Sequence, residues 1–125
     1  MSGSNGSISL LTLTVIATAA VAGCRCVTQA GAYPAAGAAA FGVTRSSAEA
    51  AGDLVPVDVQ GTAIAEAGAA ITLDAPLMVD ATGRVVPLTV GSKSPVGRAM
   101  QAATAAGQQI EILLVPSAGL VSAAS

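Results

Sequence analysis

The chain has no histidine and no tryptophan, and its 125 residues include only one tyrosine and one phenylalanine. The absence of histidine removes the commonest general base and the commonest metal ligand of proteins. Five scattered basic residues and a net charge of −2 offer no basic patch, and so few aromatic rings provide no platform for base stacking. We therefore expect neither a histidine-based active site nor a nucleic-acid interface.

Charge is also scarce, and the apolar residues are small. Hydrophobic residues make up 53% of the chain, charged residues 10% and aromatic residues 2%, and alanine dominates the apolar set. Burial of apolar surface contributes about 25 cal/mol per Å², so a core of small side chains stabilises a single domain of this length only modestly. The composition therefore favours a chain that associates with copies of itself or with a larger surface.

Only two cysteines are present, Cys24 and Cys26. On a strand their side chains point to the same face, where a disulfide between them would be strained. A zinc site would need further cysteine or histidine ligands, which the sequence lacks. We expect two free thiols, buried or half-buried, as suits a reducing compartment, and no metal or cofactor.

The segment LTVIATAAVAGC, residues 13–24, allows two interpretations. Val21–Cys24 matches the pattern at which bacterial lipoproteins are cleaved and lipidated, after an apolar run of suitable length. However, the preceding MSGSNGSIS has no basic residue, which a signal peptide needs, and Thr12 and Thr14 alternate with apolar neighbours. Alternation with period two and β-branched residues is typical of a strand. A strand is the favoured interpretation, and a lipoprotein signal ending at Cys24 is the alternative.

Three segments of the first half of the chain recur in the second half in the same order. TVIATA at residues 14–19 matches TAIAEA 48 positions later, and CVTQAG at residues 26–31 matches MVDATG 52 positions later. The segment that begins at Phe41 matches the one that begins at Val96, 55 positions later. Alanine and glycine are so frequent that single matches carry little weight, but the common order and the matching glycine turns indicate an internal duplication.

These patterns predict an all-β fold, a small barrel or sandwich of about eight strands built from two duplicated halves. At most one short helix is expected, within Met100–Ala106. Half-buried strands such as Leu54–Val59 alternate apolar and polar side chains between glycine turns. The predicted organisation is a flexible arm, a barrel-like domain of two repeat units and a flexible tail, at residues 1–9, 10–116 (units of about 11–60 and 61–116) and 117–125.

No catalytic constellation stands out in the sequence. Without histidine, a serine or cysteine nucleophile would need lysine as its base, and Lys93 in the loop GSKSP is the only lysine. The acidic residues fall mostly in turns or on predicted outer faces, and the glycines form no phosphate-binding loop. We therefore expect no enzymatic activity.

GDLVPVDVQGTAIAEAGAAI at residues 52–71, followed by DATGRVVPLTVG, PVGRAM and AAGQQIEILLV, resembles the capsid cement, or head decoration, proteins of tailed bacteriophages. The resemblance covers about residues 10–115 and rests on the order of glycine turns and valine-rich strands. It implies a structural virion protein that binds the outer capsid surface and stabilises the expanded shell by bridging major capsid protein subunits. It implies homo-oligomers, trimers more commonly than dimers, and no catalytic residues.

The expected partners are the major capsid protein of the same phage and further copies of the chain, with no nucleic acid and no membrane. The expected location is the outer surface of the virion capsid, after synthesis in the cytoplasm of the host bacterium. Two alternatives remain open: an exported bacterial lipoprotein with a β-domain lipidated at Cys24, and a small β-rich binding module of a cellular complex.

The polar N-terminal arm is the predicted contact with the capsid, because an extended arm can order on a shell and add a strand to an exposed sheet edge. The predicted contact residues are Ser2, Ser4, Asn5, Ser7, Ile8 and Ser9.

Deletion of Ser2–Ser7 is expected to weaken binding to capsids and to leave the fold intact, because the arm precedes the first predicted strand. Cosedimentation with expanded shells measures the binding, and circular dichroism checks the fold. Equal decoration of shells by the full and shortened chains would contradict the predicted arm contact.

Overall fold

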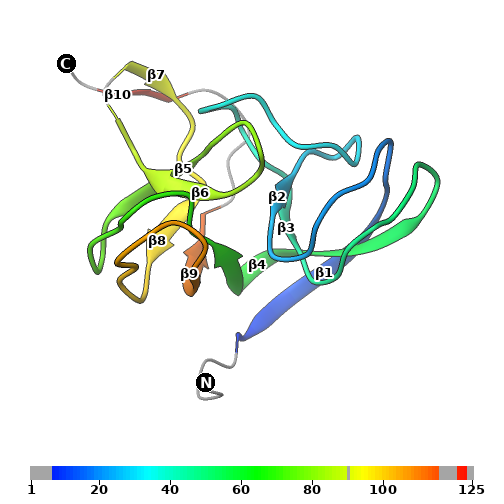
Figure 1. The fold of residues 1–125 in the computed structure, drawn as a ribbon, viewed down its shortest axis with the longest axis horizontal. Coiled ribbons are helices and arrows are strands. Elements are labelled where there is room, and N and C mark those ends of the chain that lie inside the picture. Colours follow the sequence, from blue (N-terminus) through cyan, green and yellow to red (C-terminus); the bar gives the residue numbers. More distant parts are fainter. Residues whose placement is uncertain (1–6, 90, 116–120, 124–125) are drawn as a thin grey trace.

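Ten β-strands and no helix form the part of the chain that the computed structural model describes, which is residues 7–89, 91–115 and 121–123. The strands, shown in Figure 1, are β1 (Ser9–Ile16), β2 (Cys26–Val27), β3 (Gly42–Thr44), β4 (Leu54–Glu66), β5 (Pro76–Val79), β6 (Val85–Pro87), β7 (Gly91–Lys93), β8 (Gly97–Ala99), β9 (Gln109–Leu114) and β10 (Val121–Ala123). The prediction of an all-β fold is confirmed. Within these ranges no helix is long and apolar enough to cross a membrane.

Eight strands form one sheet, in the order β2-β3-β4-β9-β8-β5-β6, with β1 paired to β4 beside this path. β7 and β10 form a separate antiparallel pair. A parallel bridge between Ala67 and Val85 joins the end of β4 to β6, and the Gly68 N–H donates to the Val85 carbonyl oxygen (2.8 Å). Through this contact the sheet comes close to closing into a small barrel, as the strand patterns predicted.

β4 is the longest strand, with 13 residues, and it belongs to both halves of the molecule. Its first part pairs with β1 and β3, and its second part, Thr62–Glu66, pairs with β9. Gly61 lies between the two parts with a φ of +97°, and a Cβ atom there would overlap the carbonyl oxygen of Ile8. Glycine is therefore required where the strand passes from one half to the other.

The hydrophobic core is divided between the two halves and consists mainly of valine and alanine. Val15, Val55 and Val57 belong to the cluster of the first half. The cluster of the second half includes Cys26 and Val43, which come from β2 and β3 of the first half. The first half therefore covers part of the core of the second half.

The segment LTVIATAAVAGC forms the end of β1 and the loop that follows it. β1 ends at Ile16, Val21 forms an antiparallel bridge with Ala48, and the Cys24 N–H donates to the Thr44 carbonyl oxygen (2.9 Å). The interpretation of this segment as a strand is confirmed for its first part.

The two halves repeat the same backbone hydrogen bonds. In the first half, the Gly52 N–H donates to the Ala17 carbonyl oxygen (2.7 Å), and in the second the Gly107 N–H donates to that of Ala67 (2.8 Å). Gly52 and Gly107 both have a φ of +95°. Two isolated antiparallel bridges repeat in the same way, joining Val21 to Ala48 and Ile71 to Ala103.

These repeated bonds correct the sequence alignment of the first strand. Ala17 corresponds to Ala67, an offset of 50 positions (67 − 17) where the sequence indicated 48. A slip of two residues keeps every side chain on the same face of a strand, so the alanine-rich pattern does not reveal it. The offset of 52 holds for the turn, in which Gly31 and Gly83 have φ of +82° and +81°, but not for β2, because Cys26 corresponds to Pro76. The offset of 55 holds for Gly52 and Gly107.

Backbone pairing occurs at both ends of the described chain. The Ile8 N–H donates to Thr62 Oγ1 (2.6 Å), the Thr62 N–H donates to the Ile8 carbonyl oxygen (2.8 Å), and β1 begins at Ser9. At the other end, where a flexible tail was predicted over residues 117–125, Val121–Ala123 pairs with β7.

Gly31→Ala is expected to destabilise the fold more than Gly52→Ala. Both positions have positive φ, which costs a non-glycine residue about 1–2 kcal/mol. A Cβ at Gly31 would also overlap the Ile16 carbonyl oxygen, whereas at Gly52 it meets nothing within 4 Å, so overpacking adds about 1–3 kcal/mol only at Gly31. Urea unfolding of both variants measures the difference, and equal midpoints would contradict this packing argument.

Candidate interaction surfaces

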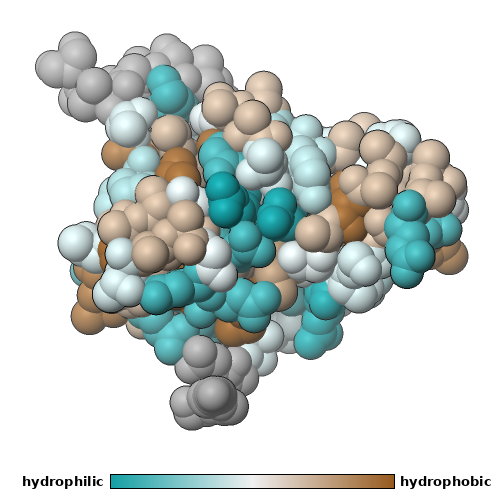
Figure 2. Space-filling model, in the orientation of Figure 1, coloured by the Kyte–Doolittle hydropathy of each residue, from teal (hydrophilic) through white to brown (hydrophobic). Residues whose placement is uncertain are grey.

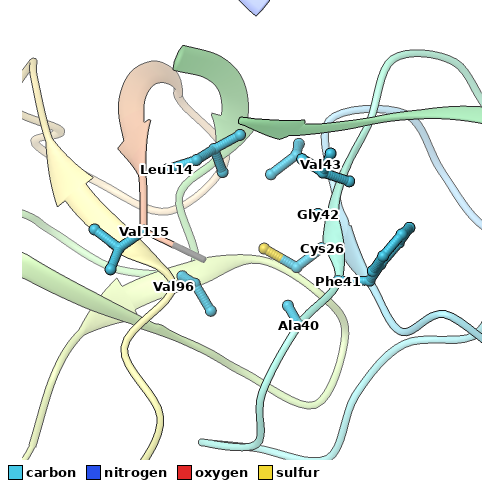
Figure 3. Close-up of a pocket in the computed structure, with 9 residues that line it drawn as sticks. Cys26, Ala40, Phe41, Gly42, Val43, Val96, Leu114 and Val115 are labelled. Atoms are coloured by element: carbon cyan, nitrogen blue, oxygen red, sulfur yellow. The ribbon is translucent and has the colours of Figure 1, made fainter. Parts of the chain in front are cut away.

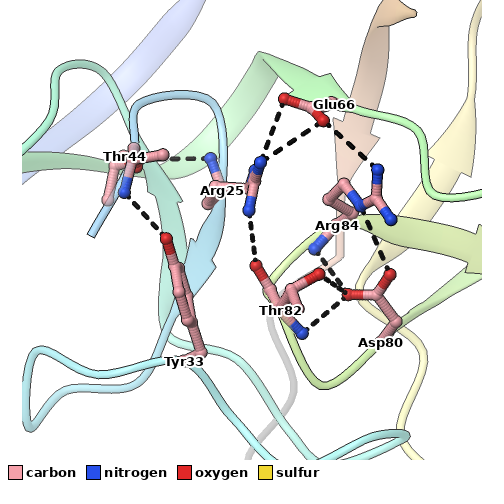
Figure 4. A network of polar contacts seen from close by, with 8 residues as sticks. Arg25, Tyr33, Thr44, Glu66, Asp80, Thr82 and Arg84 are labelled. Carbon is pink, nitrogen blue, oxygen red and sulfur yellow. Dashed lines mark hydrogen bonds and ion pairs between the residues drawn. The ribbon is translucent and has the colours of Figure 1, made fainter. Parts of the chain in front are cut away.

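A polar network joins the loops of the two halves, as Figure 4 shows. Arg25, just before β2, places Nη2 at 3.3 Å from both carboxylate oxygens of Glu66 at the end of β4. Arg84 approaches the same carboxylate at 3.5 Å, and the Arg25 Nη1 donates to the Thr82 carbonyl oxygen (2.9 Å). Glu66 thus compensates two half-buried guanidinium groups, and the network has a structural role.

Asp80 organises the turn between β5 and β6. Its Oδ1 accepts hydrogen bonds from the Thr82 N–H (2.9 Å), the Thr82 hydroxyl (2.8 Å) and the Arg84 N–H (2.9 Å). Burial by itself raises the pKa of this carboxyl, but the hydrogen bonds and the charge of Arg84 outweigh burial and hold the pKa below its ordinary value. The group is therefore an ionised acceptor near neutral pH and is not suited to act as a general acid.

Both cysteines are free, with Cys24 half-buried and Cys26 buried, which confirms the expectation of two free thiols. Burial, and then the carboxylate of Glu66, raise the pKa of the Cys24 thiol. Burial, together with Asp80, raises the pKa of Cys26 to about 12. Neither thiol is activated as a nucleophile.

Lys93, the candidate base of the sequence analysis, lies at the end of β7 and packs along Gly37. A Cβ atom on Gly37 would overlap the Cδ of Lys93. The neighbouring Ser94 is buried, and its N–H donates to the Gly37 carbonyl oxygen (2.9 Å). In the described ranges no three or more acidic, cysteine or histidine side chains form a group that could hold a metal ion.

A small apolar cavity lies between the two halves, and Figure 3 shows the Cys26 side chain beside it. Val43 and Val59 line it from the first half, and Val96 and Leu114 from the second. Its volume of about 10 Å³ has room for roughly one water molecule. It is a gap in the packing, too small for an organic ligand.

The large apolar side chains that the described residues expose come from two groups of elements, one around β1 and one around the end of β9. Figure 2 shows apolar residues among polar ones on one face of the molecule. The first surface, here called the N-terminal edge, comprises Ile8, Leu10, Leu11, Leu13, Ile16 and Leu54. The second, the C-terminal edge, comprises Leu73, Met100, Leu113 and Val115. Surfaces that gather exposed apolar side chains commonly mark sites of association.

The N-terminal edge is built on β1, in which six of eight residues are exposed. Leu10 is 73% exposed and Ile16 is 61% exposed, and the strand contains no charged residue. β1 pairs with β4 on one side, and in the described chain no other strand pairs with it. An edge strand without charges is prone to pair with another chain, so this edge is a candidate binding surface.

The C-terminal edge surrounds an open groove of about 420 Å³. Leu73, Met100 and Leu113 line it, and the Arg98–Asp74 ion pair (3.2 Å) lies at its rim. Both charged side chains are more than half exposed, so the pair contributes at most about 1 kcal/mol. The groove is shallow and apolar, as suits a docking surface.

The residues predicted to contact the capsid are only partly within the described chain. Ser2, Ser4 and Asn5 lie outside it. Ser7 is half-buried, Ile8 is exposed at the start of the N-terminal edge, and the Ser9 hydroxyl bonds with Thr12 Oγ1 (2.8 Å). The apolar residues of both edges were missed by the sequence analysis, which predicted half-buried strands.

The chain is similar to a described protein family and to a solved structure. A family model described as phage cement protein matches residues 6–114. The head fiber gp8.5 N base of bacteriophage phi29 has a similar solved structure, with a TM-score of 0.69 and 21% sequence identity over 84% of this chain and 93% of that chain. At this identity the likeness shows a shared fold. No curated protein matches the chain.

Acidification is expected to destabilise the protein partly through Asp80. Because the folded-state pKa of Asp80 lies below the ordinary value of 3.8, its contribution is present above that value and is lost as the pH falls through the folded-state pKa. Asp80→Asn keeps an acceptor for Thr82 and Arg84 but does not titrate. The free energy of unfolding should therefore decrease less for this variant than for the wild type below about pH 4, and parallel urea-unfolding curves over pH 2–7 test it.

Proposed function

The chain belongs to the phage cement protein family, and from this premise we propose that it binds the outer surface of a phage capsid and bridges neighbouring major capsid protein subunits. In this role it stabilises the expanded shell against the pressure of packaged DNA. The major capsid protein of the same phage is the proposed partner, and the outer capsid surface is the proposed location after synthesis in the host cytoplasm.

The observation that carries the proposal is the placement of the large apolar side chains. The chain buries mostly valine and alanine and exposes leucine, isoleucine and methionine on its two edges. Each of these side chains contributes about 1.5–3 kcal/mol when it passes from exposed to fully buried, which covering by a partner would provide. Their exposure supports a subunit whose apolar surface is covered only in an assembly.

Bridging gives a physical account of cement activity. A protein that binds the expanded shell and not the unexpanded shell stabilises the former by RT ln(1 + [L]/Kd) per site, about 2.7 kcal/mol at a hundredfold excess over Kd. Repetition of the contact over the shell multiplies this modest term, so each site needs only moderate affinity. The hydrogen-bonded strands of the two halves support such contacts.

We further propose that the chain acts as a homotrimer and that its N-terminal arm contacts the shell. The arm leads directly into Ile8, whose backbone is bonded to Thr62, so any strand it adds to a capsid edge is anchored to the body of the molecule. The small core supports self-association, because burial between copies supplements burial within each copy.

Shells decorated with the protein are expected to retain packaged DNA to a higher temperature than bare shells, because binding favours the expanded state. A fluorescent dye that reports released DNA measures the transition, and cosedimentation measures the bound protein. Binding to unexpanded shells, the matched control, should be at least tenfold weaker. Failure to bind expanded shells, or binding without a rise in the release temperature, would contradict the proposal.

A further inference from the structure

The internal repeat relates the two exposed edges to a contact that already exists inside the molecule. Residues up to Val27 correspond to positions 50 later, and residues from Gly42 onward to positions 55 later, as the repeated hydrogen bonds and strand pairings show. Thus Cys24 corresponds to Asp74, and these are the two non-glycine residues with positive φ in the described chain. Their N–H groups donate to the carbonyl oxygens of Thr44 and Ala99, again 55 positions apart.

Inside one chain, the first half docks on the outer side of the second part of β4. The Glu66 N–H donates to the Cys24 carbonyl oxygen (2.9 Å), and Arg25 pairs with the Glu66 side chain (3.3 Å). Around the same junction a groove is lined by Arg45 and Asp58 of the first half and, from the second half, by Ile64 and Gln109. We call the first-half side of this contact the docking face and the second-half side the receiving face.

The repeat counterpart of the docking face is the C-terminal edge. Cys24 corresponds to Asp74, Arg45 to Met100 and Asp58 to Leu113, and these counterparts line the open groove of the C-terminal edge. The second half therefore presents the surface with which the first half docks, but within the described residues that surface faces an open groove.

The repeat counterpart of the receiving face is the N-terminal edge. Glu66 corresponds to Ile16 and Gln109 to Leu54, both of which are more than 60% exposed. In antiparallel pairing the Ile16 N–H points away from β4, just as the Glu66 N–H points away from β9 toward Cys24. The first half thus offers an unoccupied copy of the receiving face.

The residues that differ between the internal contact and its two counterparts change in a complementary way. On the docking side Arg25, Arg45 and Asp58 are replaced by Ala75, Met100 and Leu113. On the receiving side Glu66 and Gln109 are replaced by Ile16 and Leu54. At these five positions both faces are apolar, which matches one to the other, whereas Asp74 and Thr14 are the polar counterparts of Cys24 and Ile64.

We propose that the C-terminal edge of one copy docks on the N-terminal edge of a second copy, in the arrangement with which the first half docks on the second half inside one chain. The first part of β4 corresponds to β9 and its second part corresponds to β1, and Val115 and Leu10 both correspond to Gln60 between these parts. The end of β9 in one copy therefore adjoins the start of β1 in the next copy, as the two parts of β4 adjoin within a chain. The Ile16 N–H then donates to the Asp74 carbonyl oxygen of the other copy, and Ala75 packs on Ile16 in place of the Arg25–Glu66 ion pair.

One internal bond has no counterpart between copies. The Cys26 N–H donates to the Gly83 carbonyl oxygen (2.7 Å), but Cys26 corresponds to Pro76, which has no N–H. The contact is head-to-tail, so copies that rotate by a suitable angle close into a ring, and other angles give open chains. This inference rests on the proposed self-association and is independent of capsid binding.

The test is the self-association of the purified chain, followed by sedimentation velocity over a range of concentrations. Ile16→Glu introduces on the N-terminal edge the residue type of its counterpart Glu66, and Met100→Arg introduces on the C-terminal edge that of Arg45. Both positions are exposed in a single copy. Each is expected to weaken association at least tenfold, because a charge then faces an apolar surface. Ala36→Glu, at an exposed position outside both edges, is the matched control and should associate like the wild type.

The double variant Ile16→Glu with Ala75→Arg rebuilds between copies the ion pair that Arg25 and Glu66 form within a chain, and it should recover most of the association lost in Ile16→Glu. A wild-type chain that stays monomeric, or edge variants that associate like the control, would overturn the inference. Shell decoration by the same proteins is measured separately. Association that responds as expected without decoration would contradict the capsid function alone, and decoration by a wild-type chain that does not self-associate would contradict this interface alone.

Discussion

β4 runs unbroken for 13 residues through both halves of the molecule, so the backbone hydrogen bonds of each half fix the position of the other. Its first part pairs with β1 and β3, and its second part pairs with β9. Beyond β9 the sheet continues through β8, β5 and β6. The Glu66 carboxylate at its end also binds the arginines that hold the loops of both halves. β4 therefore contributes buried side chains to both cores.

Alternation of apolar and polar residues was sufficient to predict the all-β fold, and glycines at matching positions were sufficient to reveal the repeat. The register of the first strand was wrong because a shift of two residues preserves the faces of a strand, and alanine and threonine recur at that spacing. The arrangement of Arg25, Glu66 and Arg84 was not predictable, because they come from three separate segments and only tertiary packing brings them together.

The interaction surfaces were not predictable from local pattern either. LTLTVI alternates like a half-buried strand, but β1 lies at the border of the sheet, where both of its faces meet solvent. Exposure is a property of the position of a strand within the sheet, which sequence periodicity does not encode. The groove around Leu113 and Met100 likewise requires the pairing of β8 with β9, together with the turn that carries Leu73.

The unbroken backbone between the two halves also explains why their mutual contact tolerates so much charge. Covalent linkage keeps the halves at an effective concentration that reaches the millimolar range or more, so the contact within a chain requires little affinity of its own. Two separate copies have no such advantage and must overcome the loss of translational freedom with apolar burial. In the interface that we propose between copies, Ile16, Leu54, Met100 and Leu113 supply this burial, whereas a polar junction suffices where a peptide bond already joins the halves.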